Sequence, residues 1–142
     1  MSVTKTFTVT VANPGAGNRY YIDGVLQQTV NLIEGNTYRF DQSDNTNGGH
    51  PFKFSTTSNG THGGGSEYTT GVTINGTPGQ AGSYTEINVA IGAPQLYYYC
   101  QYHSGMGGAA NTVSSVDTTF TVTVATGTTF RSGNTGNVYF IN

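Results

Sequence analysis

Hydrophobic and polar residues alternate along several short stretches of this chain. Phe7, Val9 and Val11 alternate with threonines, which is the two-residue period of a strand with one buried face. Similar stretches follow, separated by turns rich in glycine, asparagine and proline; we predict strands over residues 20–22, 25–32, 37–40, 52–54, 68–74, 83–91 and 96–100. No stretch has the 3.6-residue apolar period of a long helix. The pattern predicts an all-β protein built as an antiparallel β-sandwich.

The composition agrees with this class and argues against several kinds of partner. The chain has 142 residues, which is long enough for one sandwich core, and only 8% of them are charged. Its formal net charge is −2, so no basic surface is expected to attract nucleic acid or anionic lipid. No apolar run approaches the length that spans a membrane. We therefore expect neither nucleic acid nor a membrane as a partner.

The end of the chain repeats its beginning. Residues 119–125 (TFTVTVA) are identical to residues 6–12, and residues 138–142 echo residues 19–23. Self-similarity of this kind is typical of repeated modules. We predict one module over residues 1–116, followed by a C-terminal β-hairpin over residues 117–142. This hairpin is interpreted either as the start of a second, truncated repeat or as a strand that joins a sheet edge, in this chain or in a neighbouring one.

The candidate chemistry lies in the stretch LYYYCQYHSGMGG, residues 96–108. Cys100, the only cysteine, is followed at three-residue intervals by His103 and Met106. A thiolate, an imidazole and a thioether together favour copper over harder metals. A trigonal site with one cysteine, two histidines and a weak axial methionine needs one ligand from outside this loop. His50, where a glycine-rich loop enters the strand at 52–54, is predicted as that ligand for one copper ion.

Two other kinds of site use some of the same residues. Structural zinc normally takes four cysteine or histidine ligands, so a zinc site would drop Met106 and recruit His62. His62 lies in a glycine-rich loop and is interpreted as a solvent-exposed residue. A nucleophilic Cys–His pair built on Cys100 is conceivable, but it leaves Met106 and His50 unexplained. A multicopper enzyme needs further histidine-rich centres, and His62 is the one histidine that remains. We therefore expect no enzymatic activity.

The ligand loop, the tyrosine-rich strand before it and the stretch Gly49-His50-Pro51-Phe52 together resemble the type 1 copper site of the cupredoxins, the plastocyanin and amicyanin-like proteins. The resemblance implies a cupredoxin-like Greek-key sandwich with His50, Cys100, His103 and Met106 as copper ligands. Pro51 departs from the pattern, because many cupredoxins carry there an asparagine that ties the two ligand loops together by hydrogen bonds. Such bonds orient ligands and tune the metal, so the departure bears more on the redox potential than on copper binding.

The module over residues 5–116 also resembles plastocyanin-like modules in virion proteins of marine phages and in large surface proteins. The first residues lack a secretory signal, which fits a virion protein that is released by lysis. We predict a copper-binding module that serves as a structural or display component of a virion appendage or an extracellular assembly, with one-electron transfer as a further role. The alternative is a dedicated soluble electron-transfer protein with an unknown redox partner.

Overall fold

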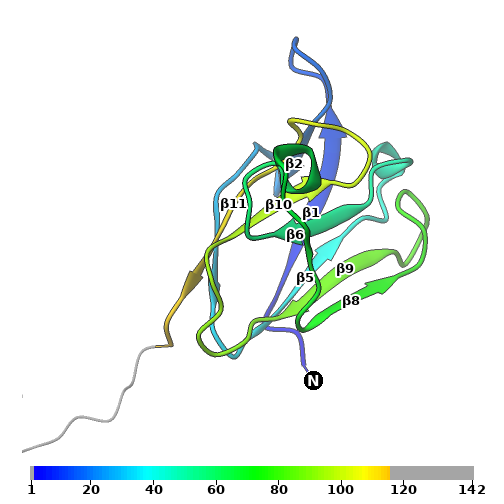
Figure 1. The fold of residues 1–142 in the computed structure, drawn as a ribbon. Helices are drawn as coiled ribbons and strands as arrows, with labels where there is room; N and C mark the ends of the chain where they lie inside the picture. Colours follow the sequence, from blue (N-terminus) through cyan, green and yellow to red (C-terminus); the bar gives the residue numbers. More distant parts are fainter. Residues whose placement is uncertain (1, 116–142) are drawn as a thin grey trace, which may run out of the picture.

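The computed structural model describes residues 2–115 as two β-sheets packed face to face (Figure 1). The first sheet has the strand order β3-β2-β1-β5-β9-β8 and the second the order β4-β11-β10-β6-β7. In chain order the strands are β1 (Lys5–Ala12), β2 (Arg19–Ile22), β3 (Val25–Leu26), β4 (Val30–Ile33), β5 (Thr37–Asp41), β6 (Phe52–Ser55), β7 (Glu67–Tyr68), β8 (Val72–Asn75), β9 (Tyr84–Asn88), β10 (Leu96–Cys100) and β11 (Gly108–Val113). Two short 3₁₀ helices, η1 (Asn45–Asn47) and η2 (Gly60–Gly63), lie in loops. The predicted hairpin over residues 117–142 lies outside the described residues.

The all-β sandwich is confirmed, and the sheets are mixed rather than purely antiparallel. Strand β1 pairs in parallel with β5, and β4 pairs in parallel with β11, while the other strand pairs are antiparallel. Parallel neighbours require a crossover connection. The chain supplies one by leaving the first sheet after β3, forming β4 in the second sheet and returning as β5. Within residues 2–115, no helix is long and apolar enough to cross a membrane.

Two of the predicted strands are each divided between the two sheets. The predicted strand over 25–32 is β3 in the first sheet and β4 in the second, and the one over 68–74 is β7 in the second sheet and β8 in the first. The chain bends between these pieces at Gln27 and Gly71, which have φ angles of 45° and 71°. Strand β11, composed mainly of small and polar residues, was not indicated by the hydrophobic pattern. Alternation within a stretch therefore identified strands but not the sheet to which each belongs.

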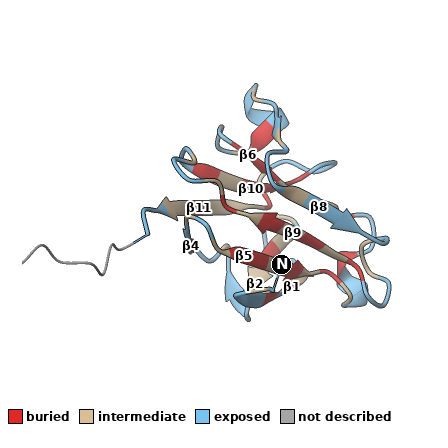
Figure 2. Ribbon diagram, turned by 90° about the horizontal axis from the view of Figure 1, so that it is seen from below, coloured by how far each residue is buried: buried red, intermediate tan, exposed pale blue. Residues whose placement is uncertain are grey.

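Aromatic side chains from both sheets pack together in the core. Buried residues occur along strands of both sheets (Figure 2). The ring of Phe52, from β6, stacks on Phe40 with ring centroids 4.7 Å apart and on Tyr98 at 5.0 Å. It also contacts Tyr20 of β2 at 5.2 Å. All four rings are fully buried, and aromatic pairs of this kind contribute about 0.5–1.5 kcal/mol each beyond their buried area. Because Phe52 follows His50 by two residues, this packing fixes where β6 begins.

Candidate metal centre

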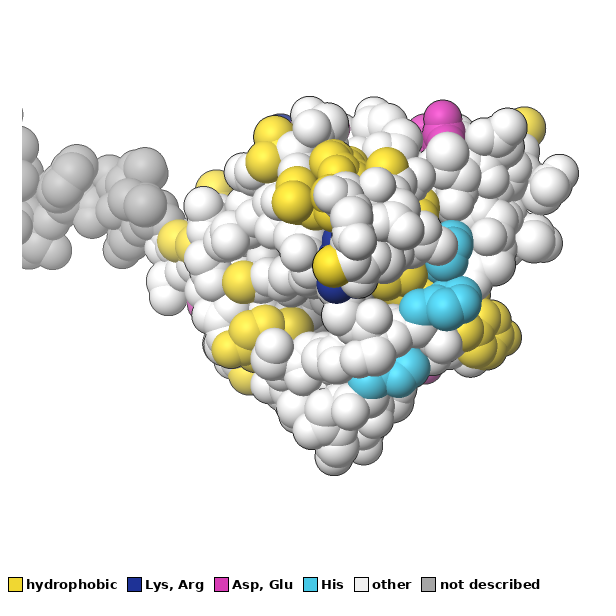
Figure 3. All heavy atoms as spheres, turned by 90° about the horizontal axis from the view of Figure 1, so that it is seen from above, with side chains coloured by type: hydrophobic (Ala, Val, Ile, Leu, Met, Phe, Trp, Pro, Cys, Tyr) yellow, Lys and Arg dark blue, Asp and Glu magenta, His cyan; other side chains and the backbone are white. Residues whose placement is uncertain are grey.

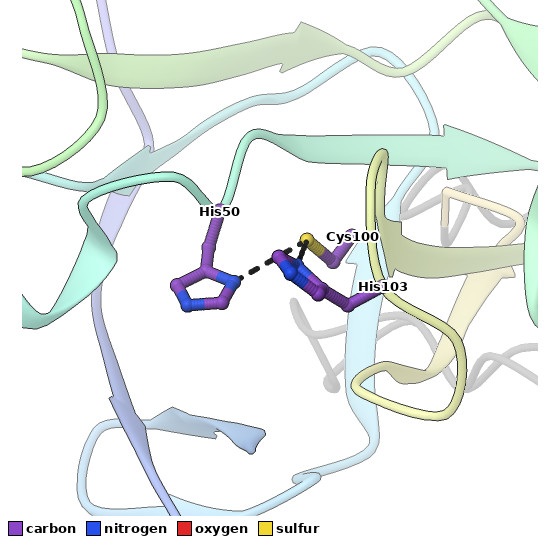
Figure 4. A group of neighbouring side chains, drawn as sticks. All are labelled: His50, Cys100 and His103. Carbon is purple, nitrogen blue, oxygen red and sulfur yellow. Dashed lines mark hydrogen bonds between the residues drawn. The ribbon is translucent and has the colours of Figure 1, made fainter. Parts of the chain in front are cut away.

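Three of the predicted ligands meet at one end of the second sheet (Figure 4). His50 lies just before β6, Cys100 is the last residue of β10, and His103 lies in the loop that connects β10 to β11. Strands β6 and β10 pair antiparallel, with Cys100 opposite Phe52. The end of β10 is therefore beside the start of β6, which brings together two residues that are fifty positions apart in the sequence.

The distances between the ligand atoms suit a single metal ion. Cys100 Sγ lies 3.6 Å from His50 Nδ1 and 3.5 Å from His103 Nδ1, and the three atoms all lie within 4.8 Å of one another. Bonds of about 2.3 Å to sulfur and about 2.0–2.1 Å to nitrogen, the lengths seen with zinc, place these two atoms roughly 3.5 Å apart at a near-tetrahedral angle. The observed separations therefore fit one first-row metal ion held by all three side chains.

The other two candidate residues occupy different surroundings. Met106 is buried in the same core cluster as Cys100, and its backbone oxygen accepts a hydrogen bond from the Tyr20 N–H at 2.9 Å. His62 is exposed, as predicted, and its Nε2 lies 2.8 Å from the backbone oxygen of Cys100. The side chains of all three histidines are visible on one face of the molecule (Figure 3). His62 is thus near the cluster but is not one of its members, so the fourth ligand that a zinc site would recruit is engaged elsewhere.

A nucleophilic role for Cys100 is poorly supported by its environment. The residue has no exposed surface, whereas His103 beside it is exposed. A cysteine nucleophile needs a thiolate that a substrate can approach. A thiol enclosed between two imidazoles suits metal ligation better than attack on a substrate.

A two-sheet β-sandwich with a Cys-His₂ cluster between the start of β6 and the β10–β11 loop is the arrangement that the sequence resemblance implied. The fold is cupredoxin-like. Among solved structures, the chain is similar to rusticyanin from Thiobacillus ferrooxidans, with 16% identity, a TM-score of 0.46 and 79% of each chain covered. It is also similar to reduced rusticyanin, with 15% identity, a TM-score of 0.46 and coverage of 80% of this chain and 82% of that one.

A third structure of rusticyanin, described as a copper protein, has 15% identity and a TM-score of 0.46, and the match covers 79% of this chain and 80% of that one. No protein-family model and no curated protein sequence matches the chain. At identities of 15–16% and a TM-score of 0.46, the similarity concerns the overall path of the backbone and not individual residues. The metal centre rests on the residues of this protein alone.

Burial shifts the pKa values of two titratable groups in and beside this cluster. Desolvation lowers the pKa of His50 below its ordinary value, and the neighbouring His103 lowers it further. The neutral imidazole that this favours is the form that binds metal ions. Burial raises the pKa of Tyr20 well above its ordinary value, and the nearby Cys100 raises it further. Tyr20 therefore keeps its proton at neutral pH and remains a hydrogen-bond donor.

Tyr20 connects the two ligand segments. Its hydroxyl donates a hydrogen bond to the backbone oxygen of His50 at 2.7 Å, while its backbone N–H donates to Met106 at 2.9 Å. A link between the segments therefore exists although Pro51 stands where many cupredoxins have the linking asparagine. The sequence pattern marked Tyr20 only as a strand residue, since nothing local indicates a partner thirty positions away.

Gln42 holds the chain on both sides of Pro51. Its side chain is buried, and Nε2 donates to the backbone oxygen of His50 at 2.7 Å and to Asn47 Oδ1 at 3.0 Å. Its Oε1 accepts a hydrogen bond from the Phe52 N–H at 3.1 Å. Within residues 2–115, no buried side-chain nitrogen or oxygen lacks a hydrogen-bond partner. The position of His50 therefore depends on a fully satisfied polar network beneath it.

Replacing Gln42 with leucine is expected to lower the free energy of unfolding of the metal-free protein by about 2 kcal/mol, because the substitution removes the partners of the buried Phe52 N–H and the Asn47 side-chain oxygen. Urea unfolding followed by circular dichroism measures the loss. Gln95→Leu is the matched control, since Gln95 is exposed, and it is expected to change stability by less than about 0.5 kcal/mol. Equal losses in the two variants would contradict the role given to Gln42.

Proposed function

We propose that this protein binds one copper ion at a type 1 site formed by His50, Cys100, His103 and Met106. The observation that carries the proposal is the buried Cys100 sulfur with an imidazole nitrogen at 3.5 Å and another at 3.6 Å, while His62 lies outside the cluster. One thiolate, two imidazoles and a nearby methionine are the donors of blue-copper sites, whereas structural zinc takes four cysteine or histidine ligands.

The chain's own residues are arranged for one-electron exchange. Copper bound at this cluster would supply the Cu(I)/Cu(II) redox couple. Cys100 and His50 are buried and are held by hydrogen-bonded backbone, so water is kept from most of the cluster. His103 is exposed, so one ligand reaches the surface where a redox partner would approach. A ligand set that is already assembled needs little rearrangement when the charge of its metal changes.

Titration of the full chain with Cu(II), followed by visible absorption, tests the proposal. We expect an intense thiolate-to-copper charge-transfer band that saturates at one equivalent and bleaches reversibly on addition of a reductant. Zn(II) is the control, because it competes for the same donors but gives no visible band. A protein that binds Cu(II) without the intense band would overturn the type 1 assignment.

We further propose that the module works within an assembly, a virion appendage or an extracellular structure, through strand addition by residues 118–142. The identity of residues 119–125 with residues 6–12 of β1 supports this context. The fold also offers receiving edges, since β3 and β4 are the outermost strands of their sheets. These edges carry exposed apolar side chains, which are 49% exposed at Val25, 45% at Leu26 and 40% at Ile33. Edges of this kind are templates for another strand.

Deletion of residues 118–142 is expected to convert a self-associating protein into a folded monomer that keeps the β-sheet signal of residues 2–115. Light scattering coupled to size-exclusion chromatography, together with circular dichroism, measures both properties. Val122→Asp in the full chain is a milder test of the same segment, because a charge in place of an apolar side chain opposes docking of the segment at a sheet edge. A full chain that is already monomeric would favour the alternative, a dedicated soluble electron-transfer protein.

A further inference from the structure

The segment between β6 and β7 contacts the metal centre at several points. Asn59 Oδ1 accepts a hydrogen bond from the Gly105 N–H at 2.9 Å, and its Nδ2 donates to Ser104 Oγ at 2.8 Å. His62 Nε2 lies 2.8 Å from the backbone oxygen of Cys100, so this nitrogen carries the proton and donates. These bonds reach Cys100 itself and the loop that carries His103 and Met106.

The same segment covers the strand that ends at Cys100. The backbone of Gly60 lies directly on the ring of Tyr99, so close that a Cβ at this position would overlap the ring. The imidazole of His62 stands edge-on to the same ring, with centroids 6.2 Å apart. Tyr99 is consequently only 1% exposed, although it lies on the opposite face of β10 from Tyr98 and Cys100, which belong to the core cluster. The outer face of β10 is therefore covered next to the site.

Hydrogen bonds within the segment fix its shape. Ser55 Oγ accepts from the Thr57 N–H at 3.1 Å and donates to the Ser66 backbone oxygen at 2.7 Å, which closes the segment at its base. The Gly65 N–H donates to the Gly60 oxygen at 3.0 Å. Asn59 adopts the left-handed conformation, with φ 64° and ψ 11°. A non-glycine residue in this region is uncommon and is a reason to look for a function, and here it accompanies two bonds to the ligand loop.

We propose that residues 56–66 form a brace that fixes the ligand loop, residues 101–107, before any metal binds, with Asn59 and His62 as positioning residues. Gln27 also holds the loop, because its Nε2 donates to the backbone oxygens of Gly105 and Gly107 at 3.0 and 2.7 Å. The effect on metal binding rests on the proposed copper function. The effect on the loop does not, since it belongs to the metal-free chain.

Amide hydrogen exchange of the metal-free protein tests the brace without copper. Asn59→Gly removes the side chain and leaves a residue that tolerates the left-handed conformation. We expect exchange at the Gly105 amide to accelerate about tenfold. Asn75→Gly is the matched control, because Asn75 makes a similar exposed bond to the Gly82 oxygen at the far end of β8, and it should leave Gly105 unchanged. Unchanged exchange in Asn59→Gly would overturn the proposal.

Copper titration of the same variants tests the positioning role. We expect Asn59→Gly to raise the Cu(II) dissociation constant about 10–100-fold, the usual effect of losing a partner that orients a ligand. His62→Phe should shift the visible band, whereas His62→Gln, which keeps an N–H donor for the Cys100 oxygen, should restore it. Faster exchange at Gly105 without any change in copper binding would overturn the positioning role. Faster exchange with no visible band in the unmodified protein would retain the brace and refute the copper site.

Discussion

Replacing Cys100 with serine is expected to abolish the intense visible band of the copper-loaded protein and to raise the Cu(II) dissociation constant by at least about 100-fold. The band needs a thiolate bound to copper, and a serine hydroxyl stays protonated at neutral pH and is a harder donor. The two histidines, His50 and His103, remain in place and are expected to retain weak binding. Absorption spectroscopy and competition with a chelator measure the two effects.

Ala110→Ser is the matched control for this substitution. Ala110 is fully buried on β11, the strand next to β10, so the control also introduces a hydroxyl into the core. Burial of a hydroxyl without a partner costs about 1–3 kcal/mol, but the control leaves the cluster intact and should keep the band. If Cys100→Ser retained the intense band, Cys100 would not be the copper-bound sulfur.

Replacing Gly107 with alanine is expected to lower the free energy of unfolding of the metal-free protein by about 3 kcal/mol or more. An added Cβ would overlap the backbone oxygen of Tyr98 and would lie 2.9 Å from the Cα of Tyr99. Both contacts are with the backbone of β10, which is paired on both sides by β6 and β11. Removing the overlap therefore requires movement of either β10 or the ligand loop. Urea unfolding measures the resulting loss in the free energy of unfolding.

Gly48→Ala controls for the loss of a glycine as such. Gly48 has a φ of −53°, which suits alanine, and the nearest atom to an added Cβ is the Asn45 oxygen at 3.4 Å. We expect the free energy of unfolding of the Gly48→Ala variant to change by less than about 1 kcal/mol. Similar losses of unfolding free energy in the two variants would mean that the close approach of Gly107 to β10 does not explain why alanine destabilises the protein at this position.

The link between the two ligand segments has a different chemical basis here from the asparagine of many cupredoxins. Tyr20 and Gln42 both donate to the backbone oxygen of His50, and Tyr20 also bonds the Met106 oxygen. Tyr20 comes from β2 of the first sheet and Gln42 directly follows β5 of that sheet, whereas His50 leads into β6 of the second. The geometry around His50 therefore depends on how the two sheets pack. Substitutions at the interface between the sheets are expected to change the position of His50 in the metal centre.

Local sequence determined most of the strands and the ligand loop, although it did not indicate β11. Alternation at Phe7, Val9 and Val11 predicted β1, and the same period over residues 37–40 predicted β5, because a strand places successive side chains on opposite faces whatever lies beyond it. The three-residue spacing of Cys100, His103 and Met106 likewise follows from the chain alone. Which strands would pair, and that two pairs would be parallel, depends on contacts between distant residues and could not be read from these patterns.

Only the tertiary structure decided what surrounds the site. It brought His50 within reach of Cys100 through the pairing of β6 with β10, and it turned the glycine-rich segment around Asn59 and His62 into a covering for the ligand loop. The sequence predicted His62 as an exposed residue, which is correct, but gave no sign of its bond to Cys100. A hydrogen bond between residues dozens of positions apart produces no repeating pattern in the sequence from which it could be predicted, because its geometry exists only once the two sheets are packed.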